Sequence, residues 1–249
     1  MIIIKNDKEI DLMRIAGRIV AETLLLVEKK VKPGITTAEL DRIAEEFITK
    51  HGAIPSFKGL YGFPASLCIS VNEQVVHGIP GGYVLKDGDI VSVDCGAYIN
   101  GFHGDAARTF AVGDISEEAK KLISVTEGSF FKGMEFAQVG NRLSDISHAI
   151  QSYVEASGFS VVRDFVGHGI GKEVHEDPEV PNFGRPGRGP KLVAGMTLAI
   201  EPMVNIGTYR VATLGDDWTV VSADKSLSAH YENTVVILPD GPEILTLIK

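Results

Sequence analysis

Residues 89–105, with the sequence DIVSVDCGAYINGFHGD, predict two β-strands joined by a tight turn. The turn is the pair Asn100-Gly101, because both residue types tolerate the positive φ angles that a two-residue hairpin requires. Ile99 then lies opposite Phe102, and this pairing sets the register along both strands. The turn therefore determines which side chains share a face of the hairpin.

Two aspartates of this hairpin, Asp94 and Asp105, lie on the same face in the predicted register. Asp94 is opposite Ala107 and Asp105 is opposite Gly96, so both are an odd number of steps from the turn pair. Their backbones are then diagonal neighbours, about 7–8 Å apart. Two carboxylates directed at one half-buried point repel each other and lose solvation, which is unfavourable unless a cation lies between them. The alternative is a pair of solvated aspartates on an exposed face.

Two amphipathic helices are predicted before the hairpin. Asn6 and Glu9 have the spacing of a capping box, and a helix begins there and ends before Pro33-Gly34. A second helix begins near Thr36 and stops at His51-Gly52. Apolar residues recur in both at intervals of three and four, which predicts one buried face on each helix. These residues are Ile10, Met13, Ala16, Val20, Leu24 and Val27 in the first helix, and Leu40, Ile43, Ala44 and Phe47 in the second.

The chain after the hairpin repeats this order of elements. The stretches from Ser116 to about Phe136 and from Ser144 to Gly158 predict two further helices, each opened by a serine. Strand-like sequence occupies residues 67–112 and again the region from Ser160 onward. Two helices followed by strands, twice over, indicate an α+β fold with a duplicated half. Since no low-complexity linker separates the halves, we expect one domain over residues 1–249.

Composition narrows the functional classes. The 249 residues are 44% hydrophobic and 23% charged, as in ordinary soluble globular proteins. A net charge of -9 disfavours broad nucleic-acid binding, because phosphate backbones are repelled. Cys68 and Cys95 are too few for a disulfide framework, and the sequence shows neither a signal peptide nor a membrane-spanning run. We expect a soluble, cytoplasmic protein with reduced thiols and no membrane association.

Four positions beyond the hairpin are possible metal ligands. His168 lies among glycines, where the flexible chain can bring the imidazole close to another group. Glu201 follows an apolar strand and precedes a proline, an unusual position for a charge. Glu232 lies within a predicted β-branched strand, and His175 follows seven residues after His168. Taken singly, such histidines and glutamates are more often surface or core hydrogen-bonding residues.

Together with the hairpin aspartates, these positions predict a centre for two divalent cations. Four carboxylates and one imidazole suit manganese or iron(II) better than a structural zinc site built on thiolates. Bridging carboxylates can hold two ions about 3.5–4 Å apart, as in two-metal hydrolases. The candidate ligands are Asp94, Asp105, His168, Glu201 and Glu232.

The segment of residues 182–190 is rich in Gly, Pro and Arg and could cradle an anion. It lacks the Lys-Ser/Thr pair of a phosphate-binding loop and opens no obvious helix. An ordinary surface loop is therefore the favoured interpretation.

The motifs taken together resemble type I methionine aminopeptidases, members of the pita-bread family of metallopeptidases, over nearly the whole chain. The interval between His168 and Glu201 is too short for the helical subdomain of the type II branch, and no N-terminal Cys/His zinc extension is expected. The matching stretches are Ser92-Val93-Asp94, Phe102-His103-Gly104-Asp105, Gly167-His168-Gly169-Ile170-Gly171, His175-Glu176-Asp177-Pro178, Ile200-Glu201-Pro202-Met203-Val204, Ser228-Ala229-His230-Tyr231-Glu232-Asn233-Thr234, Cys68-Ile69-Ser70-Val71-Asn72-Glu73 and Val76-His77-Gly78-Ile79-Pro80.

The resemblance implies a pita-bread α+β fold, in which helices cover a pseudo-symmetric antiparallel sheet. It implies two divalent ions, which would be Mn2+, Fe2+, Co2+ or Zn2+, and it makes Asp105 and Glu232 the bridging ligands among the five candidates. Glu201 would then serve both as a metal ligand and as a catalytic base. His77 and His175 would be catalytic residues beside the substrate, with His175 polarising the scissile carbonyl.

The resemblance also implies an apolar pocket for the methionine side chain. Phe57, Leu60 and Val174 replace the cysteine, tyrosine and phenylalanine often found in the bacterial enzymes, so the apolar character of the pocket is better defined than its outline. The implied substrate-binding residues are Phe57, Leu60, Phe63, Cys68, His77, Val174, His175 and Trp218.

The implied activity is removal of the initiator methionine from nascent proteins, with a small second residue favoured. The expected mechanism is attack of a metal-bridging hydroxide on the first peptide carbonyl, after which Glu201 passes a proton to the leaving amine. The implied partners are the N-terminal Met of nascent polypeptides and, transiently, the ribosome. A monomer is expected.

Two other readings of the same motifs stay open. Aminopeptidase P and prolidase share the metal ligands, but they carry an extra N-terminal domain, whereas the segment before Asp94 is short here. Pita-bread proteins without activity act as binding modules, but they usually lose ligands that are all present in this chain. Metal content separates an enzyme from such a module.

Overall fold

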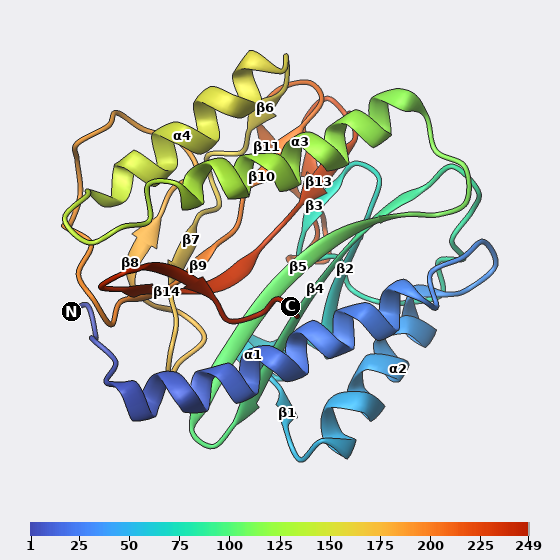
Figure 1. Cartoon of the computed structure of the whole chain (residues 1–249). Coiled ribbons are helices and arrows are strands. Elements are labelled where there is room, and N and C mark those ends of the chain that lie inside the picture. Colours follow the sequence, from blue (N-terminus) through green and yellow to red (C-terminus); the bar gives the residue numbers. More distant parts are fainter. Residues whose placement is uncertain (249) are drawn as a thin grey trace.

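The computed structural model describes residues 1–248 and confirms the predicted order of helices and strands. The α-helices in this part of the chain are α1 (Asp7–Glu28), α2 (Thr37–Lys50), α3 (Glu117–Met134) and α4 (Leu143–Ala156), and a short 3-10 helix covers Leu60–Gly62. In Figure 1 the pair α1 and α2 lies along the lower side of the molecule and the pair α3 and α4 along the upper side, with strands between them. Each helix pair precedes its own run of strands in the sequence.

The first two helices begin at their predicted caps. The Asn6 side chain accepts hydrogen bonds from the backbone N–H groups of Lys8 and Glu9, and the Glu9 carboxylate accepts one from the Asn6 N–H. This reciprocal pattern is the capping box. Thr36 caps α2 by accepting a hydrogen bond from the Glu39 N–H. Short polar side chains thus supply the acceptors that each first turn lacks.

The buried faces of these helices follow the predicted periodicity with one local difference. All the apolar residues predicted for the inner face of α1 are buried. On α2, Leu40 and Ala44 are buried as predicted, whereas Ile43 and Phe47 are only half-buried. Ile48 is fully buried instead. The face of α2 that packs against the sheet is thus rotated slightly about the helix axis from the predicted one.

The second helix pair confirms one predicted start and corrects the other. Ser116 caps α3 as predicted, but α4 begins one residue before Ser144, with Arg142 in the capping position. The Arg142 N–H donates a hydrogen bond to the Asp145 carboxylate, which fixes the helix start there. The Ser144 hydroxyl is directed away from the helix and donates to the Arg188 carbonyl oxygen. Ser144 therefore links the start of α4 to the loop that contains Arg188, and it does not cap the helix.

The segment of residues 182–190 is a surface loop and not an anion cradle. Its residues from 185 to 189 are exposed. The Gly187 N–H donates to the Asp145 carboxylate at 2.6 Å and the Arg188 N–H donates to Ser144 Oγ at 2.6 Å. These backbone donors are already used to fasten the loop to the start of α4, so they are not available to an anion.

The hairpin consists of β4 (Ile90–Ile99) and β5 (Phe102–Ala111), and its register is the predicted one. Ile99 pairs with Phe102, Asp94 with Ala107 and Gly96 with Asp105. Asn100 and Gly101 have φ angles of 54° and 87°, the positive values that this turn requires. The two aspartates consequently share one face of the hairpin, as predicted.

The strands form four sheets in which every pairing is antiparallel within the described residues. One sheet joins the hairpin to β1 (Ile54–Pro55) and β2 (Leu67–Val71) through β4. A five-stranded sheet has the order β15 (Gly241–Ile244), β14 (Asn233–Leu238), β9 (Thr197–Ile200), β7 (Gly167–Gly169), β8 (Glu176–Val180). The two smaller sheets have the orders β13 (Ser228–His230), β10 (Met203–Asn205), β6 (Ser160–Val161) and β11 (Val211–Thr213), β12 (Val220–Ser222), β3 (Gln74–Val76).

Two apolar cores bind the helix pairs to the strands and leave one face of the hairpin for other contacts. The core under α1 and α2 includes Val20, Leu24, Leu40 and Leu67, and the core under α3 and α4 includes Phe130, Ile146, Ile150, Leu198 and Val235. Val93 and Cys95 of β4 point into the first core, so Asp94 between them points the opposite way. Among residues 1–248, no helix combines the length and apolarity that crossing a bilayer demands.

Candidate metal centre

Asp94, Asp105 and Glu232 meet where the hairpin pairs with the segment before β14. The Glu232 N–H donates to the Ala107 carbonyl oxygen at 3.0 Å, and the Ala107 N–H donates back to the Glu232 carbonyl oxygen at 3.3 Å. Thr234 Oγ1 accepts from the Asp105 N–H and donates to the Asp105 carbonyl oxygen, both at 2.9 Å. Ala107 is also opposite Asp94. The three carboxylates therefore project from the same face of three neighbouring extended segments. Glu232 lies just before β14 rather than inside it.

His168 and Glu201 reach the same place from neighbouring strands of the five-stranded sheet. His168 in β7 is opposite Ala199 in β9, and Glu201 follows the end of β9 as predicted. His168 Nε2 lies 3.5 Å from Glu201 Oε1. His168 Nδ1 lies 2.9 Å from the Gly169 carbonyl oxygen, so Nδ1 carries the proton and donates it there. The lone pair of Nε2 is therefore directed toward the carboxylates.

Glycines on both sides of His168 permit this close approach. A Cβ atom at Gly167 would lie 2.3 Å from the Ala199 carbonyl oxygen, and one at Gly169 would lie 2.1 Å from the Asp177 carbonyl oxygen. Both neighbours are backbone atoms, which cannot move aside as the end of a flexible side chain can. Glycine is thus required on both sides of His168 because β7 packs closely between β8 and β9.

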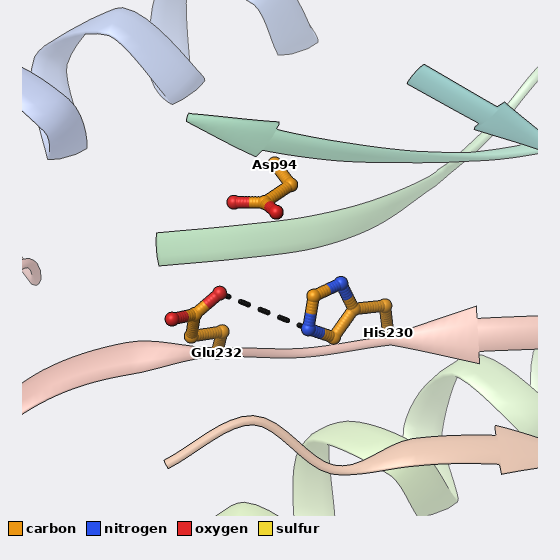
Figure 2. Close-up of side chains that lie close together, drawn as sticks. All are labelled: Asp94, His230 and Glu232. Atoms are coloured by element: carbon orange, nitrogen blue, oxygen red, sulfur yellow. Dashed lines mark ion pairs between the residues drawn. The ribbon is translucent and has the colours of Figure 1, made fainter. Parts of the chain in front are cut away.

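His230, at the end of β13, is a second histidine that faces these carboxylates. Its Nε2 atom lies 3.7 Å from Glu232 Oε2 and 3.8 Å from Glu201 Oε2. Figure 2 shows the ring beside Glu232, with the Asp94 carboxylate facing the space between them. The sequence motifs assign His230 no role. Its position two residues before Glu232 in extended chain is the signal that could have placed both on one face.

Burial raises the pKa of all four carboxyl groups, which we call the carboxylate cluster (Asp94, Asp105, Glu201 and Glu232). The pKa of Asp94 is raised to about 7. Burial followed by the charge of Asp94 raises the pKa of Asp105 and Glu201 well above the usual range, and burial followed by the charge of Asp105 does so for Glu232. The cluster cannot carry four negative charges at neutral pH unless cations compensate them.

The histidines around the cluster are neutral at neutral pH. Burial, followed by the repulsion that a second protonated imidazole at His175 would exert, lowers the pKa of His77 and His168 to about 4. Burial, followed by His77 and Arg108, lowers the pKa of His230 to about 3, and burial lowers the pKa of His175. A neutral imidazole keeps the lone pair that a metal ligand needs.

Unpartnered polar atoms show that this set of residues fits divalent ions. Four buried atoms in it have no hydrogen-bond partner, although buried polar atoms normally have one. Two triads, each of one aspartate, one histidine and Glu232, bring their donor atoms within 4.8 Å of one another. The unpartnered atoms are Asp94 Oδ1, Asp105 Oδ1, Glu232 Oε1 and His230 Nε2. The triads are Asp94-His230-Glu232 and Asp105-His168-Glu232.

An apolar cavity of about 240 Å³ opens onto the carboxylate cluster. The ring of Phe63 meets that of Trp218 edge-to-face, with 5.1 Å between the ring centroids. Val174 does not line the cavity but packs behind it in the same apolar cluster as Cys68. Tyr61 lines the cavity and was not anticipated from sequence. The anticipated residues that line it are Phe57, Leu60, Phe63, Cys68, His77, His175 and Trp218.

His175 and His77 both line this cavity. The ring of His175 is 4.5 Å from that of His168 and stacks against Tyr61 at 5.9 Å. His77 meets Phe165 edge-to-face at 5.5 Å and lines both this cavity and an adjoining one of about 390 Å³. Both histidines therefore face a space next to the carboxylate cluster without belonging to it.

A buried ion pair anchors the segment that carries His175. Lys5 Nζ lies 2.5 Å from Glu176 Oε2, and the two side chains are only 2% and 4% exposed. Glu176 Oε1 also accepts a hydrogen bond of 2.8 Å from the Lys172 N–H, and Lys5 Nζ donates to the Ile3 carbonyl oxygen. Glu176 thus has a partner for each oxygen, in contrast to the carboxylate cluster.

Comparisons with known proteins agree on one family. The model of metallopeptidase family M24 matches residues 11–239. A methionine aminopeptidase of Clostridium perfringens is 79% identical over 249 residues and covers the full length of both chains. The crystal structure of a methionine aminopeptidase from Thermotoga maritima is 48% identical, covers both chains fully and has a TM-score of 0.98. A prolidase of Pyrococcus furiosus shares only the fold, with 22% identity, a TM-score of 0.82, and coverage of 99% of this chain but 66% of its own.

Proposed function

Because the chain belongs to metallopeptidase family M24, we propose that it is a metallo-aminopeptidase that removes the initiator methionine from new polypeptides. The relatives confirm the resemblance to methionine aminopeptidases and the α+β pita-bread fold. One observation carries the proposal. Four largely buried carboxylates line one cavity together with aromatic and apolar side chains; three of them have an unpartnered oxygen, and the fourth, Glu201, lies at an ion-pair distance from two histidines.

The proposed ligands of two divalent ions are Asp94, Asp105, His168, Glu201 and Glu232. The raised pKa values and the unpartnered oxygens support this assignment, because both are explained by cations that compensate the charge. Mn2+, Fe2+, Co2+ and Zn2+ all accept such a mixture of oxygen and nitrogen donors. When bound, such ions supply Lewis-acid polarisation of the scissile carbonyl and activation of the attacking water.

The remaining chemistry is assigned to side chains of the chain itself. Glu201 is proposed to accept the proton of the attacking water and to pass it to the leaving amine, since burial raises its pKa above that of an ordinary carboxyl group and makes its carboxylate a stronger base. His175 is neutral and is proposed to donate its N–H to the carbonyl oxygen as negative charge develops there. His77, which also lines the cavity, is proposed to orient the peptide.

The apolar cavity is proposed to bind the methionine side chain. A flexible thioether fills an irregular aromatic pocket well and makes favourable contacts with ring edges, such as those of Phe63 and Trp218. The free amino group of the substrate would then lie near the carboxylate cluster, which explains cleavage after the first residue only. A small second residue is part of the proposal.

The cellular setting follows from the substrate. An initiator methionine is presented by a newly made chain, so we propose action on nascent polypeptides in the cytoplasm with transient contact to the ribosome. We propose that the protein works as a monomer, because the proposed ligands and the pocket all come from one chain.

A peptide panel with controlled metal content tests this function. The protein is stripped with a chelator, and single divalent ions are added back before assay on Met-X-Ser peptides. We expect no activity without metal, recovery with at least one ion, and fastest cleavage when X is Gly, Ala or Ser. Absence of Met-Ala-Ser cleavage with every ion would contradict the proposal.

The same panel separates the rival functions. A proline-specific peptidase would cleave Xaa-Pro peptides whose first residue is not methionine, and a binding module would cleave none. Metal content measured on each sample shows whether an inactive sample simply lacks its ions. Cleavage confined to amino-terminal methionine would rule out both rivals.

A further inference from the structure

His230 is the buried histidine that the proposed ligand set leaves unused. Its side chain is 2% exposed and its Nε2 atom has no hydrogen-bond partner. That atom faces two carboxylates that come from different parts of the chain, Glu201 and Glu232. Figure 2 shows the imidazole and the carboxylates of Asp94 and Glu232 surrounding one common space. A buried nitrogen in this position needs a partner that the protein does not supply.

The distances around Nε2 match a shared cation better than a hydrogen bond. The separations of 3.7 Å to Glu232 and 3.8 Å to Glu201 exceed the roughly 2.7–3.2 Å of an N–H···O bond. Donors that bind one ion at about 2.0–2.2 Å each lie at most about 4.4 Å apart, so both separations are compatible with a common ion. His168 Nε2 is at a similar distance, 3.5 Å, from Glu201.

The backbone holds the imidazole in this place. The His230 N–H donates to Thr109 Oγ1 at 2.9 Å, and the Thr109 hydroxyl donates to the His230 carbonyl oxygen at 2.9 Å. His230 also pairs with Met203 of β10. Neighbours on two sides thus fix the backbone from which the imidazole projects.

We propose that His230 Nε2 is a sixth protein ligand of the metal centre. This inference rests on the proposed function, because it concerns the same centre. The two triads have matching composition: one contains Asp105 and His168, the other contains Asp94 and His230, and Glu232 belongs to both. Each ion thereby receives one nitrogen donor, which favours borderline ions such as Zn2+, Fe2+ or Co2+ over Mg2+.

Nitrogen NMR on the full chain tests this assignment. The protein is labelled with 15N-histidine, stripped with a chelator and titrated with Zn2+ as a diamagnetic probe. We expect two imidazole Nε2 resonances to move to the metal-bound position. One should disappear in His168→Gln and the other in His230→Gln, while His148→Gln, an exposed histidine of α4, should leave both unchanged.

Zinc affinity gives a second readout. Loss of a direct ligand should weaken the binding of the second Zn2+ ion by more than about 100-fold. Mutation of a residue that only contacts a ligand typically lowers metal affinity by about 10–100-fold. His230→Asn serves as a second variant if His230→Gln does not fold. A single moving resonance, lost only in His168→Gln, would overturn the role of His230 and leave the proposed function standing. No moving resonance in the unaltered protein would instead contradict the metal centre itself.

Discussion

Two sets of buried charge lie next to each other in this molecule and are compensated in opposite ways. Lys5 and Glu176 form an ion pair in which each carboxylate oxygen has a donor. In the described residues no Lys or Arg forms an ion pair with a carboxylate oxygen of the carboxylate cluster, whose nearest bases are neutral histidines. Arg108, the nearby cation, donates instead to the backbone carbonyl oxygen of Glu232. Removing charges from water is unfavourable in both places, but only the first set is balanced by the protein itself.

The difference separates a structural role from a functional one. A balanced pair holds a segment in place and needs nothing from solution. An unbalanced cluster lowers the stability of the metal-free protein and is explained by what it binds, since buried groups with strongly shifted pKa values concentrate at functional sites. His175 adjoins Glu176 in sequence and contacts His168 in space, so it connects the two sets.

The largest expected effect comes from Asp105→Asn. A neutral amide is a poorer bridge, so we expect divalent ions to be lost and kcat/KM for Met-Ala-Ser to fall by roughly 1000-fold or more. Because one buried charge disappears, the metal-free variant should melt at the same temperature as the metal-free parent or higher. Asp240→Asn, at an exposed aspartate, is the matched control. Full activity in metal-replete buffer would contradict the bridging role.

Lys5→Met should have the next largest effect, but on stability and not on metal binding. It leaves Glu176 buried without a cation, which typically destabilises a protein by about 3–5 kcal/mol. Thermal unfolding of the metal-loaded variant measures this loss. The double variant Lys5→Met/Glu176→Gln should recover most of it, because neither charge is then left alone. Equal unfolding temperatures for the single and double variants would show that the pair is not coupled.

His175→Ala tests the residue between the two sets. Loss of one donor to a developing oxyanion typically reduces kcat by about 100- to 1000-fold. Metal content should stay normal, because His175 is not among the proposed ligands. His148→Ala controls for the loss of a histidine elsewhere. Turnover at the parental rate with normal metal occupancy would exclude the proposed role.

The smallest effect is expected in the pH dependence of stability. The pKa of Asp94 rises from 3.8 to about 7 on folding, so the folded metal-free protein binds more protons than the unfolded chain between these values. Its stability, and with it Tm, should therefore fall as the pH rises from about 4 to 7. The metal-loaded protein should show the opposite trend, because cations favour the ionised carboxylates. Parallel curves with and without metal would contradict the unbalanced cluster.

Local patterns made the first half of the molecule predictable. The Asn100-Gly101 turn determined the hairpin register and hence the shared face of Asp94 and Asp105, which the structure reproduces. The capping box at Asn6 and the cap at Thr36 were predicted for the same reason. Each of these features depends on residues a few positions apart, so short-range rules suffice.

Features that depend on contacts between distant parts of the sequence could not be predicted from such local patterns. Nothing near Lys5 in the sequence indicates that it pairs with Glu176, 171 positions away. The start of α4 was misplaced because Ser144 bonds to Arg188 of a separate loop. The convergence of Glu201 and Glu232 on the hairpin aspartates came from family resemblance, since single-sequence patterns do not show which strands become neighbours.

The hairpin turn has a consequence for how this chain can change in evolution. One extra residue between the turn and Asp105 would move Asp105 to the other face of the hairpin, on which Gly104 packs against Gly17 of α1, although the composition of the strand would hardly differ. A pair of extra residues would restore its direction but displace it along the strand. Selection should therefore remove insertions and deletions near residues 100 and 101 more strongly than substitutions there. The length of this segment, more than its composition, is then what evolution must conserve for cation binding.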